Sequence, residues 1–184
     1  MVQKRNDLEL IEALRKPAHI RELAKELKLV PSTVLRTLKF LQEENAVDFR
    51  KEGRNSRYFL KPSLECRQYV EMSESYKVLK AIENPLIRRI TKELRAQTNG
   101  ELILLFGSYA KGMATAGSDI DIYIETDSKV LAESLQRISG KISVKIGKLQ
   151  KDSDLGREIL LNHIVLQNLD RFFQLYEPNS SITQ

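Results

Sequence analysis

The first third of the chain has the hydrophobic pattern of three short helices. Apolar residues recur at helical spacing over residues 8–15 and 20–27. A third helix is predicted to begin at Pro31 and Ser32, with Ser32 as its N-cap. Its predicted core stripe consists of Val34, Leu35, Leu38 and Leu41. Two short helices, a tight turn and a third helix with a polar, basic outer face are typical of a helix-turn-helix arrangement.

A basic hairpin is predicted after these helices. Residues 47–50 and 57–60 have strand character, and the turn-forming residues 52–56 lie between them. A hairpin beside a recognition helix reaches phosphates next to the groove that the helix enters. The candidate DNA-binding residues are Ser32, Thr33, Arg36 and Lys39 on the helix and Arg50, Lys51, Arg54 and Arg57 on the hairpin. A module that makes only protein contacts is the alternative; the basic hairpin favours nucleic acid.

One long helix is predicted over Leu64 to Ile82, which contains neither Gly nor Pro. It carries a narrow apolar seam of Tyr69, Met72, Tyr76 and Leu79. This seam could pack on its own chain or pair with a second copy. Since helix-turn-helix proteins commonly bind two half-sites as dimers, the second possibility, a homodimer, is slightly favoured. Asn84-Pro85 then begins another helix, because proline is tolerated at the first helical position.

An apolar strand and two spaced acids form the central motif. Residues 101–106 have strand length and run into Gly107-Ser108, and Asp119-Ile120-Asp121 begins the next strand. Side chains at positions i and i+2 of a strand point the same way, so Asp119 and Asp121 should converge on one face. A hard cation such as Mg²⁺, or Mn²⁺, removes the repulsion between two such carboxylates and recruits phosphate oxygens. The alternative is a solvated strand edge without a ligand.

The turn between these strands is a candidate phosphate site. Gly107 permits a close approach of backbone to a ligand, and Ser108 begins a helix whose free N–H groups favour phosphate. Lys111, one turn further on, could add positive charge toward a triphosphate, although it could equally be a surface lysine. The candidate nucleotide-binding residues are therefore Gly107, Ser108 and Lys111.

The charge of the chain is concentrated in its first third. The 184 residues carry a net charge of +5. Residues 1–62 hold 14 Lys or Arg and 9 Asp or Glu, whereas residues 63–184 hold 16 of each. A basic module followed by a neutral one indicates an anionic partner for the former, and duplex DNA is the first to consider. The single cysteine, Cys66, excludes an intramolecular disulfide. No membrane segment or secretory signal is expected, which favours a cytoplasmic location.

Two family resemblances follow from these residues. Residues 20–60 resemble the winged helix-turn-helix family of prokaryotic regulators. The Gly107-Ser108 pair, ten further residues and Asp119-x-Asp121 resemble the minimal nucleotidyltransferases of the DNA polymerase β superfamily. The implied fold class is α+β with two domains, a winged helix followed by a small mixed-sheet nucleotidyltransferase-like α/β domain. The expected boundaries are 1–62 for the winged helix, 63–84 for a linker helix and 85–184 for the second domain.

The chain departs from the nucleotidyltransferase pattern at one position. The resemblance implies a third catalytic carboxylate on a neighbouring strand, but the matching segment 141–146 contains no acid. Ser143 or Lys145 would take its place, depending on register. Glu125 lies too far along its strand, and Asp152 and Asp154 are expected to cap the next helix. The resemblance therefore implies Asp119 and Asp121 as catalytic and metal-binding residues, with an uncertain capacity for catalysis.

Two classes of function remain open from the sequence. The first is a regulatory DNA-binding protein whose nucleotidyltransferase-like domain binds a Mg²⁺-bound nucleoside triphosphate. The second is an active enzyme that transfers a nucleotidyl group to a protein, a small molecule or an RNA end. In the resembled family, the protein acceptors include toxins with a HEPN domain, which makes such a toxin a conceivable partner.

The C-terminal part is predicted to form two helices that cover the sheet. Helical stripes run over residues 155–166 and 169–176. His163 falls within the first stripe and is expected to be a packed or hydrogen-bonded residue rather than a ligand.

Overall fold

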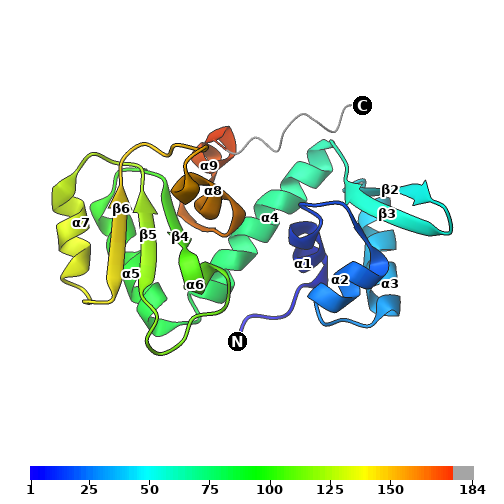
Figure 1. Cartoon of the computed structure of the whole chain (residues 1–184), viewed down its shortest axis with the longest axis horizontal. Coiled ribbons are helices and arrows are strands. Elements are labelled where there is room, and N and C mark those ends of the chain that lie inside the picture. The colour runs from blue at the N-terminus through cyan, green and yellow to red at the C-terminus, as the bar shows by residue number, and fades with distance from the viewer. Residues whose placement is uncertain (176–184) are drawn as a thin grey trace. The chain divides into compact units, whose positions relative to one another are not determined.

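The computed structural model describes residues 1–175 and divides into two compact units, residues Met1–Tyr76 and the residues from Lys77 onward (Figure 1). Tyr176, the last residue of the final predicted helix, lies outside the described part. Each unit has its own sheet, one of three strands and one of four. The structure is therefore of the α+β class, as predicted.

The first unit combines helices with a small antiparallel sheet. Its elements in chain order are α1 (Asn6–Ala13), β1 (Ala18–His19), α2 (Ile20–Glu26), α3 (Pro31–Glu43), β2 (Val47–Glu52), β3 (Asn55–Leu60) and α4 (Leu64–Ala81), the last of which continues into the second unit. The strand order is β1-β3-β2, and both pairings are antiparallel. The predicted hairpin is present with longer strands, because pairing runs out to Glu52 and Asn55 and leaves a tight turn at Gly53-Arg54. Strand β1 is an element that the sequence pattern does not predict.

Helix α3 differs from its prediction in two details. Its N-cap is Val30, and Ser32 lies inside the helix, so the predicted capping role of Ser32 is wrong. Pro31 explains the shift, because its fixed φ suits the first helical position. Val34, Leu38 and Leu41 are 0% exposed and form a stripe at i, i+4 and i+7, whereas Leu35 is 36% exposed. Leu35 therefore belongs to the outer face of the helix and not to the predicted core.

Helix α4 buries a different face from the predicted seam. Cys66, Val70 and Ser73 are buried at spacings of four and three, together with Tyr76. The Tyr76 hydroxyl accepts a hydrogen bond from the Arg5 amide at 3.1 Å, which ties this ring to its own unit. Two other seam residues, Met72 and Leu79, are exposed. The predicted seam thus does not form one continuous surface.

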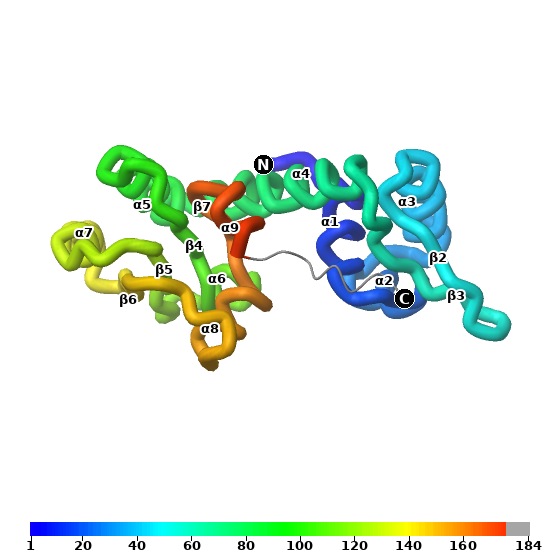
Figure 2. The backbone as a smooth tube through the Cα atoms, turned by 90° about the horizontal axis from the view of Figure 1, so that it is seen from above, coloured from blue at the N-terminus to red at the C-terminus, as the bar shows by residue number. Residues whose placement is uncertain are grey.

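The second unit is built on a mixed four-stranded sheet. Its elements in chain order are α5 (Pro85–Gln97), β4 (Ile103–Phe106), α6 (Gly107–Ala110), β5 (Ile120–Ile124), α7 (Lys129–Gln136), β6 (Ile142–Ile146), α8 (Asp154–Leu161), β7 (Ile164–Gln167) and α9 (Leu169–Leu175). The strand order is β6-β5-β4-β7, with β5 and β6 parallel and the other pairs antiparallel. Seen along the strands, α5 and α8 lie on opposite sides of the sheet (Figure 2).

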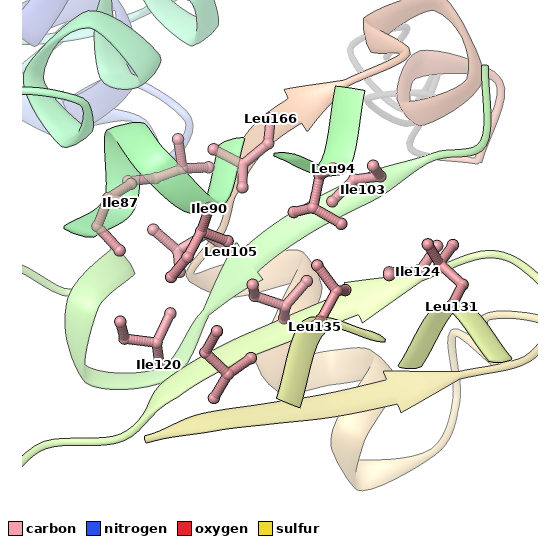
Figure 3. Close-up of a cluster of buried hydrophobic side chains, with 13 residues drawn as sticks. Ile87, Ile90, Leu94, Ile103, Leu105, Ile120, Ile124, Leu131, Leu135 and Leu166 are labelled. Carbon is pink, nitrogen blue, oxygen red and sulfur yellow. The ribbon is translucent and has the colours of Figure 1, made fainter. Parts of the chain in front are cut away.

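The core of the second unit lies between the sheet and helices α5 and α7. Ile90 and Leu94 of α5 and Leu135 of α7 point toward the strands, as Figure 3 shows. On β5 the inward positions are Ile120, Ile122 and Ile124, all 0% exposed. Because side chains alternate along a strand, the residues between them lie on the opposite face of the sheet. That face carries the acidic motif.

The predicted helix over 155–166 is wrong in its second half. Helix α8 ends at Leu161, and residues 164–167 form strand β7, which pairs with β4. A short buried apolar run fits a helical stripe or a central strand equally well, and here the partner strand decides. His163, between the two elements, is buried, and its Nδ1 atom lies 3.2 Å from the Ile159 carbonyl oxygen. This agrees with its prediction as a packed, hydrogen-bonded residue.

Within residues 1–175, no helix is both long enough and apolar enough to cross a membrane.

Candidate functional site

Asp121 and Gly107 form the centre of the candidate site. The antiparallel register pairs Phe106, the last residue of β4, with Asp121 of β5, so the chain leaves β4 beside this carboxylate. Gly107 follows with φ +69, a left-handed conformation that favours glycine. A Cβ atom at this position would overlap Oδ2 of Asp121 and lie 3.1 Å from its Cγ. The glycine is therefore required both by the backbone conformation and by the close packing of Asp121.

The predicted phosphate-binding turn is short and ordered by its own backbone. Helix α6 covers only Gly107–Ala110, and the Lys111 amide closes it with a 3.1 Å hydrogen bond to the Gly107 carbonyl. The Met113 amide then donates to the Ser108 carbonyl at 2.9 Å. Ser108 is half-buried, whereas Lys111 is exposed. These contacts place Gly107, Ser108 and Lys111 in one turn at the end of β4.

Asp119 lies just before β5, at the end of the loop that connects the two halves of the motif. In this loop the Thr115 amide donates to Ser118 Oγ at 2.8 Å, and the Ser118 amide donates to the Thr115 carbonyl at 3.0 Å. Asp119 is exposed, and Asp121 is half-buried. The two carboxylates are close enough for the charge of Asp119 to act on Asp121.

The electrostatic environment of Asp121 disfavours its ionised form. Burial is the largest cause that raises the pKa of Asp121, and the negative charges of Asp119 and Glu158 add to it, whereas a hydrogen bond with Ser143 and the charge of Lys145 lower the pKa. A divalent cation would relieve this accumulation of negative charge. The donor set, carboxylate oxygens beside a half-buried turn, is the kind that Mg²⁺ and Mn²⁺ prefer. Asp119 and Asp121 thus fit such an ion.

The parallel register shows which residue of β6 lies beside Asp121, where the resemblance implies a third carboxylate. Ser143 of β6 pairs with Asp121, and Lys145 pairs with Tyr123. Side chains that pair in register lie on the same face of a sheet, so Ser143 is the neighbour of Asp121. Lys145 lies two residues further along the same face.

The other acids that the sequence suggested are engaged elsewhere. Glu125 forms a two-pronged ion pair with Arg171, at 2.7 and 2.8 Å. Asp154 bonds Arg157 at 2.7 Å. The N-cap of α8 is Ser153, whose hydroxyl accepts from the Gly156 amide at 2.9 Å, so the predicted capping by Asp152 or Asp154 is wrong. In the described part of the chain, no three His, Cys, Asp or Glu side chains gather closely enough to hold an ion together.

Glu158 is a site residue that the sequence analysis missed. It lies on α8, and its Oε1 atom accepts a hydrogen bond from Lys111 Nζ at 2.9 Å. Its charge also acts on Asp121. No motif marks this residue, because it reaches the turn from 47 positions further along the chain. Its position beside the turn follows only from the packing of α8 against the sheet.

The predicted DNA-binding residues lie on two elements of the first unit. On α3, Ser32, Arg36 and Lys39 are exposed and Thr33 is half-buried. On the hairpin, Lys51 and Arg54 are exposed.

The strands of the hairpin bring two positive charges together. Arg50 and Arg57 pair directly across β2 and β3. The Arg50 guanidinium lies 5.9 Å from the centre of the Phe59 ring, and Arg57 Nε lies 3.4 Å from Glu52 Oε2. Like charges directly opposite each other destabilise a sheet; Glu52 offsets part of that cost at Arg57, and an anionic partner would offset more of it.

Comparison with known proteins agrees with the fold of the second unit. Residues 87–165 match the family model described as "Nucleotidyltransferase domain". This part of the chain is therefore a nucleotidyltransferase domain, and its strands and turn include both halves of the acidic motif.

Among solved structures, reduced HlyU from Vibrio cholerae is similar to this chain at 22% identity and a TM-score of 0.35, covering 40% of this chain and 78% of that chain. None of the curated proteins compared with the chain matches it.

Proposed function

We propose that this protein is a DNA-binding regulator whose nucleotidyltransferase domain binds a nucleoside triphosphate with Mg²⁺ or Mn²⁺ and does not transfer it. One observation carries the proposal: Ser143, a neutral side chain, stands beside Asp121 where a third carboxylate would be needed. Two-metal phosphoryl chemistry requires ligands for the ion on the attacking oxygen as well as for the ion on the leaving phosphates. Two carboxylates with the phosphate oxygens suffice for the second ion, but not for the first.

Each residue of the nucleotide site has a separate task in this proposal. Asp119 and Asp121 would hold the cation, which would supply positive charge for the phosphate oxygens. Gly107 lets the backbone approach the phosphates, and Ser108 presents a hydroxyl and an amide to them. Lys111 adds a positive charge on the exposed side of the turn.

Binding of duplex DNA rests on the charge of the first unit. The eight predicted contact residues lie on α3 and on the β2–β3 hairpin, as in winged helices that read the major groove and clamp the backbone. Arg50 and Arg57 lie opposite each other on β2 and β3, and an anionic partner would reduce the repulsion between them. This argument for an anionic partner is separate from the net charge. A homodimer on two half-sites is part of the proposal because of the helix-turn-helix arrangement, although the predicted seam of α4 is not one continuous surface.

Titration calorimetry with each of the four nucleoside triphosphates, in Mg²⁺ and in EDTA, tests the nucleotide proposal. We expect binding in Mg²⁺ that is strongly weakened in EDTA and is lost in Asp119→Asn and Asp121→Asn. Asp127→Asn is the matched control, because Asp127 is exposed in the loop after β5. Equal nucleotide affinity in Mg²⁺ and in EDTA would show that binding does not need the cation. An affinity of Asp121→Asn equal to that of the wild type would show that binding does not need the acidic motif.

An active transferase is the second candidate, and the intact pair of Asp119 and Asp121 in a nucleotidyltransferase domain favours it. The acceptor would be a protein, with a HEPN-domain toxin as one possibility, a small molecule or an RNA end held by the basic module. This reading requires the missing ligand to come from the substrate or from another side chain.

A further inference from the structure

The phosphate-binding lysine of the proposed site already has an anionic partner. Lys111 Nζ and Glu158 Oε1 are 2.9 Å apart, and the two side chains are 34% and 44% exposed. A partly exposed ion pair of this kind adds little stability, so a ligand with a higher charge density can separate it. Lys111 therefore forms an ion pair with Glu158 of α8 that a bound ligand can break.

The backbone of Glu158 is fixed where it is. The N-terminus of α8 is capped by Ser153, and Gly156 packs so tightly that a Cβ atom there would overlap the Gln150 carbonyl oxygen. Ile159, the next residue after Glu158, is 0% exposed. The backbone of α8 thus holds the Glu158 carboxylate within reach of Lys111, although its side chain is 44% exposed and can turn away from the lysine.

Glu158 also adds a negative charge next to the acidic motif. Together with Asp119 and Asp121, it makes three carboxylates acting on one small region, against the positive charges of Lys111 and Lys145. A phosphate group approaching this region meets repulsion from all three acids. Lys111 offers little compensation while Glu158 holds it.

From this arrangement we infer that Glu158 is a selectivity residue of the nucleotide site, which admits the cation-bound form of a nucleoside triphosphate and rejects the metal-free form. The inference rests on the proposed nucleotide binding. A metal-free triphosphate carries the larger negative charge and is repelled more strongly by Glu158. A cation-bound triphosphate is less repelled, and its phosphates replace Glu158 as the partner of Lys111.

Nucleotide affinities of four proteins test this inference: the full-length wild type, Glu158→Gln, Lys111→Gln and the double variant. Each is measured by calorimetry with the same triphosphate in Mg²⁺ and in EDTA. In EDTA, Glu158→Gln should bind the nucleotide roughly fivefold more tightly than the wild type does. In Mg²⁺ its improvement over the wild type should be smaller. The ratio of the affinity in Mg²⁺ to the affinity in EDTA should therefore be lower in Glu158→Gln than in the wild type. Replacing Glu158 should raise the metal-free affinity less when Lys111 is already replaced by Gln, because Glu158 and Lys111 form an ion pair.

Glu133→Gln is the matched control, since Glu133 is an exposed helical glutamate on α7. It should leave both affinities unchanged, and circular dichroism should show that all variants fold. Unchanged affinities in Glu158→Gln would overturn the inference. Weaker binding of the Mg²⁺ nucleotide by Glu158→Gln would also overturn it, because Glu158 would then support the cation. If neither the wild type nor Glu158→Gln binds nucleotide in either condition, the proposed function itself fails.

Discussion

The carboxylate of Asp121 packs directly against the α-carbon of Gly107, and this contact joins the two halves of the acidic motif. A side chain at position 107 would overlap Oδ2 of Asp121, and the backbone there has φ +69. The Gly-Ser turn and the acidic pair are thus one structural unit, although 14 positions of sequence separate the two residues. A side chain added at position 107 must therefore displace Asp121.

Gly107→Ala should therefore displace Asp121 and destabilise the protein. We expect a loss of about 1–3 kcal/mol in the free energy of unfolding, from the left-handed backbone and from the overlap. Cation-dependent nucleotide binding should be lost as well. Chemical denaturation and calorimetry measure the two effects. Gly117→Ala is the control, because a Cβ there has no neighbour within 4 Å. Normal nucleotide affinity in Gly107→Ala would contradict the proposed place of the turn in the site.

Restoring an acid beside Asp121 should strengthen the cation site. Ser143→Asp places a carboxylate on the position paired with Asp121, so the affinity for Mn²⁺ in the presence of nucleotide should rise about tenfold or more. Electron paramagnetic resonance of Mn²⁺ measures it directly. Lys145→Asp is the comparison, since residue 145 pairs with Tyr123 instead. A larger gain in Mn²⁺ affinity from Lys145→Asp than from Ser143→Asp would contradict the claim that position 143 lies beside the cation site.

Asp121→Asn should stabilise the protein when no cation is present. The pKa of Asp121 is raised by burial and by neighbouring acids, so its ionised form is less favourable in the folded state than in the unfolded chain. This penalty exists at pH values above the folded pKa and disappears below the unfolded pKa. In EDTA, Asp121→Asn should therefore raise the free energy of unfolding at pH 7 by less than about 1 kcal/mol. The gain should vanish as the pH approaches about 3.5. Denaturation curves at several pH values check this, and a gain that grows toward low pH would contradict it.

The hairpin should contribute sequence-independent affinity for DNA. Arg54→Ala should weaken binding to every duplex and lower the slope of log affinity against log salt by about 0.9, the value for one phosphate contact. Arg57→Ala should have a smaller effect, because Glu52 lies 3.4 Å from its guanidinium. Fluorescence anisotropy over a salt series measures both. Arg157→Ala, which removes an exposed arginine of α8, should leave the slope unchanged. An unaltered slope in Arg54→Ala would exclude the hairpin from DNA binding.

Local patterns predicted most elements correctly but failed where distant partners decide. The strand before Gly107, the strand of Asp121 and the long helix from Leu64 all follow from periodicity and turn residues. Strand β7 does not, because Ile164–Gln167 becomes a strand only by pairing with β4. Helical spacing predicts Leu35 in the core stripe of α3, but the burial of Val34, Leu38 and Leu41 shows that Leu35 faces outward.

The site could be predicted as far as its motif extends. Gly107, Ser108, Asp119 and Asp121 occur within one short segment, so the motif and the resemblance that it carries predict them as site residues. The choice between Ser143 and Lys145 requires the strand register, since both lie on the same face of β6. Glu158 requires the position of α8 against the sheet. Such non-local relationships leave no periodic signal in a single sequence.

The most direct test of the central claim is an incubation of the protein with α-labelled nucleoside triphosphates, Mg²⁺ and a cell lysate. We predict that the protein retains label as intact triphosphate, that Asp121→Asn loses this retention, and that no macromolecule becomes covalently labelled. Robust covalent labelling that disappears in Asp121→Asn would contradict the regulatory account. It would establish the protein as an active nucleotidyltransferase despite the serine beside its acidic pair.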